Sequence, residues 1–176
     1  MNGQRRFLLD TNVFIEAHRH YYAFDICPGF WECLSLYHDR ILSIDSVRKE
    51  LEDKSKDQKD ELWKWIKSEL PRTFFIPNDN SRVMKHYSEI VQWVMANRQY
   101  FPQAKQEFAE VADSWLIAHA MADGFVLVTH ETSEPTRQNR VKIPNVCEQF
   151  NVEYANTFEM LRELEEQFVR DARYRQ

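Results

Sequence analysis

Short apolar runs alternate with longer segments of helical periodicity along this chain of 176 residues. The apolar runs, which predict strands, are Phe7–Leu9, Ile41–Ile44, Phe74–Ile76, Phe125–Val128 and Val152–Tyr154. The segments with the three- and four-residue apolar spacing of helices are Val47–Asp53, Lys59–Leu70, Ser81–Asn97, Phe108–Ala122 and Thr157 to near the carboxyl terminus. Because parallel strands are joined by helical crossovers, this alternation predicts a mainly parallel central sheet between helices, a three-layer α/β/α sandwich.

The length of the chain suits one well-buried core and is too short for two ordinary domains. We therefore expect a single domain over residues 1–176, with a C-terminal helix or tail from about residue 157. No apolar run is long enough to cross a bilayer, and too few apolar residues precede Asp10 for an export signal. The three cysteines form no CxxC pair, which favours free thiols in the cytoplasm.

Charge and glycine content exclude several classes of function. The net charge of −5 argues against general adhesion to nucleic acid, but it permits an enzyme whose acids bind metal. With three glycines in the whole chain, no glycine-rich phosphate cradle of the P-loop or dinucleotide type can be formed.

Four acidic residues follow strands or lie near the beginnings of helices. Asp10 comes directly after the first predicted strand, and Glu131 lies just past the fourth. Glu50 lies one turn into the helix after the second strand, and Asp113 lies early in an apolar helix, where an unpaired carboxylate is unfavourable. Because ligands of parallel sheets bind beyond the carboxyl ends of the strands, we expect these acids to converge at that edge.

Converging carboxylates need a counter-charge. Two unit charges about 4 Å apart repel by about 4 kcal/mol at an effective dielectric constant near 20. A hard divalent cation such as Mg²⁺ or Mn²⁺ removes this repulsion and prefers oxygen ligands. Such a cation can activate water and stabilise negative charge on a phosphate, so the acids predict a metal-dependent nuclease.

The segments LLDTNVFI, SVRKEL, ADSWLIAHA and GFVLVTHE, in this order over residues 8–131, resemble the motifs of the PIN-domain nucleases. That family includes the toxins of bacterial toxin–antitoxin pairs. By this resemblance Asp10, Glu50 and Asp113 match the three central metal-binding acids, and Glu131 stands where the family usually has aspartate. The resemblance implies a catalytic and metal-binding set of these four residues, with Mg²⁺ or Mn²⁺ as the cofactor.

The same resemblance assigns supporting roles. Thr11 and Asn12 match the polar pair after the first acid, with Asn12 hydrogen-bonded to Asp10, and Thr129 matches a hydroxyl residue near the end of the fourth strand. From the residues themselves, candidate contacts with substrate phosphate are Arg48 and the cations of a polar loop over Thr132–Pro144, namely Arg137, Arg140 and Lys142. Taken singly, each of these four would be an ordinary surface charge. The family implies metal-dependent cleavage of RNA by an endoribonuclease, a cognate antitoxin protein as partner, and frequent homodimers.

Other interpretations of these residues stay open at the level of sequence. Asp10 is also placed to cap the following helix, and Asp113 would be equally satisfied by a buried salt bridge to a lysine or arginine. Glu50 and Glu131, taken singly, would be ordinary solvated acids. Glu110, three residues before Asp113, would share its face of a continuous helix.

Two other functions compete with the nuclease. The glutamate at position 131 favours a catalytically degenerate PIN-like module that binds RNA or protein without cleaving. A phosphatase of the haloacid dehalogenase type also has an aspartate at the end of its first strand. That family requires a second aspartate two residues later, where this chain has Asn12.

Overall fold

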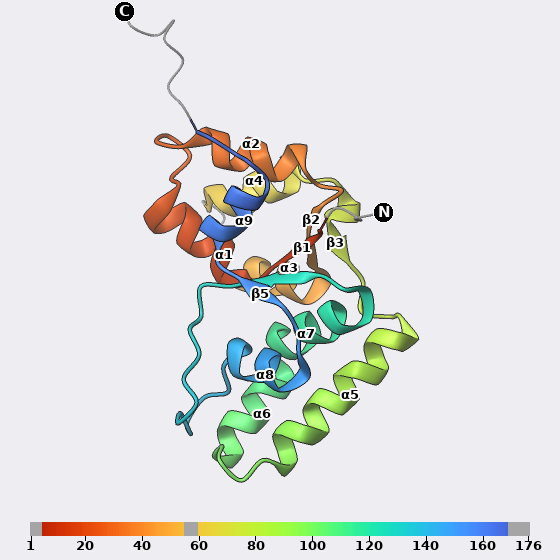
Figure 1. Ribbon diagram of the computed structural model, residues 1–176. Helices are drawn as coiled ribbons and strands as arrows, with labels where there is room; N and C mark the ends of the chain where they lie inside the picture. The colour runs from red at the N-terminus through yellow and green to blue at the C-terminus, as the bar shows by residue number, and fades with distance from the viewer. Residues whose placement is uncertain (1–4, 55–59, 169–176) are drawn as a thin grey trace, which may run out of the picture.

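The computed structural model describes residues 5–54 and 60–168. At its centre is a five-stranded sheet in the order β3-β2-β1-β4-β5, in which every neighbouring pair is parallel (Figure 1). The strands are β1 (Phe7–Leu9), β2 (Ile41–Ile44), β3 (Phe75–Ile76), β4 (Val126–Val128) and β5 (Tyr154–Ala155). The parallel sheet expected from the sequence is confirmed.

Helices fill the segments between the strands. Within the described ranges they are α1 (Thr11–Glu16), η1 (Ala17–Tyr21, a π-helix), α2 (Pro28–Leu36), α3 (Asp45–Lys54), α4 (Glu61–Glu69), η2 (Arg72–Phe74, a 3₁₀ turn), α5 (Ser81–Ala96), α6 (Pro102–Glu110), α7 (Ala112–Asp123), α8 (Ile143–Phe150) and α9 (Thr157–Glu163). The start predicted at Lys59 and the end of the C-terminal segment, residues 169–176, lie outside the described residues.

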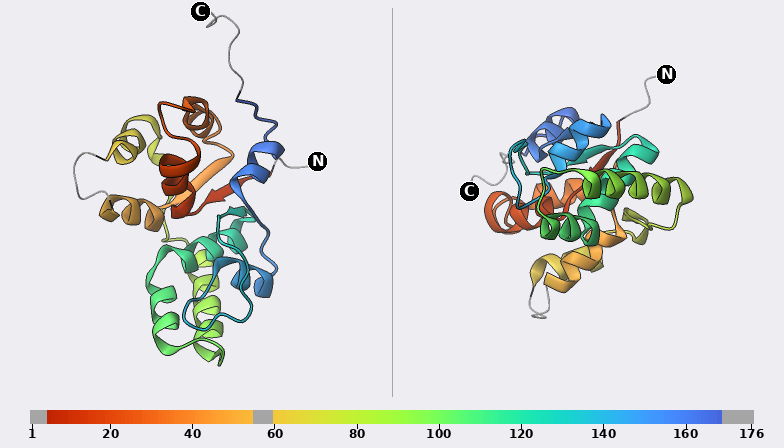
Figure 2. Two further views of the ribbon diagram at one scale, coloured as in Figure 1. Left: turned by 90° about the vertical axis from the view of Figure 1, so that its left-hand side faces the viewer. Right: turned by 90° about the horizontal axis from the view of Figure 1, so that it is seen from below.

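The helices form two layers, one on each side of the sheet. In Figure 1, α1, α2, α4 and α9 lie above the strands, and α5, α6, α7 and α8 lie below them. The turned views show the same division (Figure 2). Helix α3 contacts α1 in one layer and α7 in the other. This arrangement is the three-layer α/β/α sandwich that the alternation predicts, and none of the described helices combines the length and apolar character of a membrane-spanning helix.

The helix predicted over Phe108–Ala122 is instead two helices. Helix α6 ends at Glu110, Val111 is extended (φ −91°, ψ 173°), and α7 begins at Ala112. The backbone N–H of Ala112 donates to the Glu50 carboxylate at 2.9 Å. This bond satisfies an amide that an uninterrupted helix would pair within itself, so α7 begins as a separate helix at the Glu50 side chain.

Two helices were not predicted from the sequence. Helix α2 was missed although its buried residues, Phe30, Trp31, Cys33 and Leu34, have helical spacing, and α8 begins within the segment predicted as a loop. Both have proline in the first turn, at Pro28 and Pro144, where the missing N–H removes no helical hydrogen bond.

The centre of the sheet fixes the position of the first acid. All three residues of β1 are fully buried, and β1 lies between β2 and β4. Leu9 pairs with Val128, so the residues after these two strands, Asp10 and Thr129, lie side by side at the carboxyl edge of the sheet. The backbone N–H of Asp10 donates to the Val128 carbonyl at 3.0 Å, which holds this edge together.

Candidate active site

Asp10 lies between β1 and α1, with 1% of its surface exposed. Although it occupies the N-cap position of α1, its side chain makes no capping hydrogen bond. Its Oδ2 atom instead accepts hydrogen bonds from Thr129 Oγ1 at 2.9 Å and from Asn12 Nδ2 at 3.4 Å. The capping alternative therefore does not account for this carboxylate.

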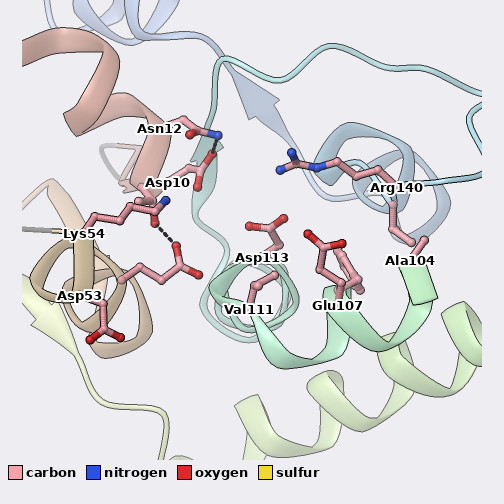
Figure 3. Close-up of a pocket in the computed structure, with 13 residues that line it drawn as sticks. Asp10, Asn12, Asp53, Lys54, Ala104, Glu107, Val111, Asp113 and Arg140 are labelled. Atoms are coloured by element: carbon pink, nitrogen blue, oxygen red, sulfur yellow. Dashed lines mark hydrogen bonds between the residues drawn. The ribbon is translucent and has the colours of Figure 1, made fainter. Parts of the chain in front are cut away.

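Asp113 lies in the first turn of α7 and is half-buried. Throughout the described chain, no lysine or arginine nitrogen lies within ion-pairing distance of its carboxylate, and no hydrogen bond satisfies it. The buried salt bridge considered as an alternative is thus absent from this part of the molecule. Figure 3 shows Asp113 and Asp10 facing the same pocket.

Burial and mutual repulsion raise the pKa values of both carboxyl groups. Loss of hydration is the main factor that raises the pKa of Asp10 to about 6, with smaller contributions from the charges of Glu131 and Glu50. The hydrogen bond from Thr129 opposes this rise in pKa. Burial likewise raises the pKa of Asp113 well above its usual range, with the Asp10 charge as the next cause. A bound cation would relieve both effects.

Glu50 connects three elements of the site. Its Oε2 atom accepts a hydrogen bond from Thr11 Oγ1 at 2.7 Å, at the start of α1. Its Oε1 atom accepts the Ala112 N–H at the start of α7. Because both oxygens are engaged, Glu50 fixes the end of the helix that carries Asp113 as well as contributing negative charge to the cleft.

Glu131 has nearly no exposed side-chain surface, at 5%. Its Oε1 atom contacts Arg140 at 3.0 Å and Lys142 at 3.3 Å, and its Oε2 atom accepts the Ile143 N–H at 2.9 Å. Glu131 is therefore no solvated surface acid, and two cations and a backbone amide already engage its carboxylate. Its role as a metal ligand stays a prediction.

A cleft of about 400 Å³ opens over these acids. Its charged lining residues are Asp10, Glu50, Asp53, Lys54, Glu107, Asp113 and Arg140. Thr11 and Asn12 also line it, whereas Thr129 and Glu131 lie behind it and touch it through Asp10 and Arg140. Arg48 is exposed on α3 and is not part of the lining.

Glu107 is a cleft residue that the sequence did not reveal. In a continuous helix, residues six positions apart lie about 240° apart around the axis, so Glu107 and Asp113 would face different sides. The break at Val111 removes that constraint, and Figure 3 shows the Glu107 side chain near Asp113. Glu110, which periodicity places beside Asp113, is exposed and accepts a hydrogen bond from Gln106 at 3.0 Å. The proline that begins α6 at Pro102 was the available signal for an earlier helix start.

The donors around the cleft suit a hard divalent cation. They are carboxylate oxygens, which such a cation prefers as ligands. The two most central, on Asp10 and Asp113, repel each other, and no lysine or arginine in the described part of the chain is paired with either. Within residues 5–54 and 60–168, however, no three acidic, histidine or cysteine side chains are grouped closely enough to form a complete metal-binding set. The described residues therefore offer oxygen donors of the type that a divalent cation prefers, on Asp10 and Asp113, but not a complete set of protein ligands.

Comparisons with known proteins support the fold. A family model described as "Domain of unknown function (DUF4411)" matches residues 7–168. Among solved structures, the crystal structure of VapBC2 from Rickettsia felis bound to a DNA fragment from their promoter matches with a TM-score of 0.51 and 19% identity, covering 85% of this chain and 97% of the other. A comparison with curated proteins finds no match. At this identity the likeness shows the fold, and it confirms the PIN-like architecture expected from the motifs.

Proposed function

The chain belongs to the DUF4411 family, and from its PIN-like fold and carboxylate cleft we propose that it is a divalent-metal-dependent endoribonuclease. One observation supports this proposal above the others. Asp10 and Asp113, 103 positions apart in the sequence, face one cleft with raised pKa values, and no lysine or arginine among residues 5–54 and 60–168 forms an ion pair with either. Groups whose pKa values are strongly shifted in a cleft are typical of functional sites.

Asp10 and Asp113 would hold Mg²⁺ or Mn²⁺, with Glu50 as the third acid beside them. When bound, such a metal activates water and stabilises the charge that develops on the phosphate during hydrolysis. Thr129 and Asn12 orient the Asp10 carboxylate through its Oδ2 atom. Glu50 fixes the first turn of α7 and thereby the direction of Asp113.

Cleavage of RNA by the purified protein tests this proposal. We expect hydrolysis of an oligoribonucleotide with Mn²⁺ or Mg²⁺, no hydrolysis with EDTA, and no hydrolysis by Asp113→Asn. Glu110→Gln is the matched control, since it removes an exposed acid three residues away and should cleave normally. Equal cleavage by the wild-type protein and Asp113→Asn would refute the assignment.

We further propose that the enzyme is the toxin of a toxin–antitoxin pair, with a cognate antitoxin as its protein partner. The support is the fold shared with VapBC2, whose structure is described as bound to a promoter DNA fragment. Induced expression should arrest growth, and Asp113→Ala should abolish the arrest. Sedimentation of the purified chain would show whether it forms the homodimer that is frequent in PIN proteins.

A module that binds RNA without cleaving it is the second candidate. It is favoured by the engagement of both Glu50 oxygens and of the Glu131 carboxylate in internal contacts. Calorimetric titration with Mn²⁺ separates the two candidates. The nuclease should bind Mn²⁺ and lose that binding in Asp113→Asn, whereas the binding module should show no Mn²⁺ binding that depends on Asp113.

A further inference from the structure

The loop between β4 and α8 places two cations around one buried acid. Arg140 and Lys142 both contact Glu131 Oε1, at 3.0 Å and 3.3 Å. The other oxygen of Glu131 accepts the Ile143 N–H. Thr129 accepts the backbone N–H of Glu131 at 3.1 Å while donating to Asp10, so this group is joined directly to the acid site.

The contacts of Glu131 favour a structural use of its charge over metal binding. A metal ligand needs an oxygen with a free lone pair directed at the metal, and cations beside that oxygen repel the metal. Glu131 Oε1 has two cationic neighbours within 3.3 Å, and Oε2 is bound to the first turn of α8. Glu131 also does not line the cleft.

Arg140 is the member of this group that reaches the cleft. Its side chain is 46% exposed, and Figure 3 shows its guanidinium group extending over Asp113 toward Asp10. The ion pair with Glu131 runs through one guanidinium nitrogen, whereas a guanidinium group carries five N–H donors. The remaining donors can form a bidentate contact with phosphate oxygens.

The charge of the cleft creates a need for such a group. Five acids and two cations line it, so a polyanionic substrate meets net negative charge even where a divalent metal is bound. An arginine over the central carboxylates lowers that repulsion at the place where a phosphodiester would approach the metal.

We propose, on the basis of the ribonuclease function above, that Glu131 is a positioning residue that holds Arg140 so that its guanidinium group contacts the substrate phosphodiester. Glu131 thus contributes to substrate binding, and the carboxylates of Asp10 and Asp113 would hold the metal, with Glu50 fixing the start of α7 beside them. Lys142 shares Glu131 Oε1 and also contacts Glu134 at 3.6 Å, which fixes the same loop.

Steady-state cleavage of an oligoribonucleotide tests the role of Arg140. Losing a charged hydrogen-bonding contact should raise KM roughly tenfold in Arg140→Gln, with a smaller change in kcat. Arg82→Gln is the control, because Arg82 is also exposed and ion-paired, to Asp123 at 2.7 Å, but lies on α5 and does not line the cleft. An unchanged KM in Arg140→Gln would overturn the proposal.

Glu131→Gln tests the positioning role. It should raise KM as Arg140→Gln does, and the double variant should show little further loss, since the two residues act through one contact. Its affinity for Mn²⁺ should equal that of the wild-type protein. A fall in Mn²⁺ affinity in Glu131→Gln with unchanged KM would identify Glu131 as a metal ligand and refute the proposal. If Glu131→Gln fails to fold, the KM of Arg140→Gln still tests the proposal.

Binding without catalysis separates this proposal from the function on which it rests. In EDTA, a labelled oligoribonucleotide should bind Arg140→Gln more weakly than either the wild-type protein or Arg82→Gln. That result together with no cleavage under any metal would refute the nuclease and retain Arg140 as a phosphate contact. If the wild-type protein cleaves RNA but all three proteins bind the oligoribonucleotide equally, the nuclease function is supported and the proposed role of Arg140 is refuted.

Discussion

Thr129 Oγ1 donates a 2.9 Å hydrogen bond to Asp10 Oδ2, which joins two buried side chains that lie 119 residues apart. A donor of this kind stabilises the ionised carboxylate, so it opposes the rise in pKa that burial causes. The ionised form is also the form that binds a cation.

Thr129→Val should therefore weaken both the fold and the metal site. The variant leaves Asp10 Oδ2 without its strongest partner, and the loss should lower the free energy of unfolding by about 1–3 kcal/mol. Mn²⁺ affinity at neutral pH should fall, because the pKa of Asp10 rises further. Chemical denaturation and calorimetry measure these effects, and Thr129→Ser, which keeps the hydroxyl, should resemble the wild-type protein.

The metal-free protein should gain stability on acidification through Asp10. Its pKa is about 6 in the folded state against 3.8 in the unfolded state, so the folded state binds the proton more tightly. This contribution is fully present below the unfolded value and is lost as the pH rises through about 6.

Between about pH 7.5 and about pH 5, the unfolding free energy of the wild-type protein should rise relative to that of Asp10→Asn by on the order of 1 kcal/mol. The comparison with Asp10→Asn is needed because His119 and His130 have lowered pKa values and destabilise the fold as the pH falls. A difference that does not change over this pH range would contradict the raised pKa of Asp10.

Asp113→Asn should be more heat-stable than the wild-type protein in EDTA at pH 8. The substitution removes a charge that burial and the Asp10 carboxylate disfavour, and no described partner loses a contact. Added Mn²⁺ should raise the Tm of the wild-type protein and leave that of Asp113→Asn unchanged. Lower stability of Asp113→Asn in EDTA would show that this carboxylate has a stabilising role instead.

Glu50→Ala should destabilise the protein by about 1–2 kcal/mol, the usual effect of removing a helix cap. It leaves Thr11 Oγ1 and the Ala112 N–H without their acceptor. Because α7 then loses its fixed first turn, Mn²⁺ binding should fall as well. Arg48→Ala, an exposed change on the same helix, should keep the stability and the Mn²⁺ affinity of the wild-type protein.

The parallel sheet and the meeting of distant acids followed from local patterns. Asp10 had to reach the carboxyl edge because an apolar strand ends directly before it, and its neighbour β4 brings Thr129 to the same edge. These outcomes depend on parallel strand direction and burial, which the alternation of apolar runs with helical segments predicts, whereas the order of the strands came from the structure.

Contacts made by single side chains could not be predicted in this way. The break at Val111 accompanies the hydrogen bond from the Ala112 N–H to Glu50, 62 residues earlier in the chain. Because of that break, Glu107 lies at the cleft. The partners of Glu131 lie in an irregular loop, where spacing carries no information on which cation meets which acid. The motifs therefore predicted the acids and the Asn12 partner of Asp10, but not the partners of Glu50 and Glu131.

The position of β1 between β2 and β4 also governs when the site can exist during synthesis. A ribosome must release the chain past residue 129 before β1 gains its second neighbour and Asp10 its hydroxyl partner. Until then β1 is paired on one side alone, and the Asp10 carboxylate lacks the hydrogen bond from Thr129. The central sheet and the Asp10 environment therefore form only after the segment that carries β4 has been synthesised.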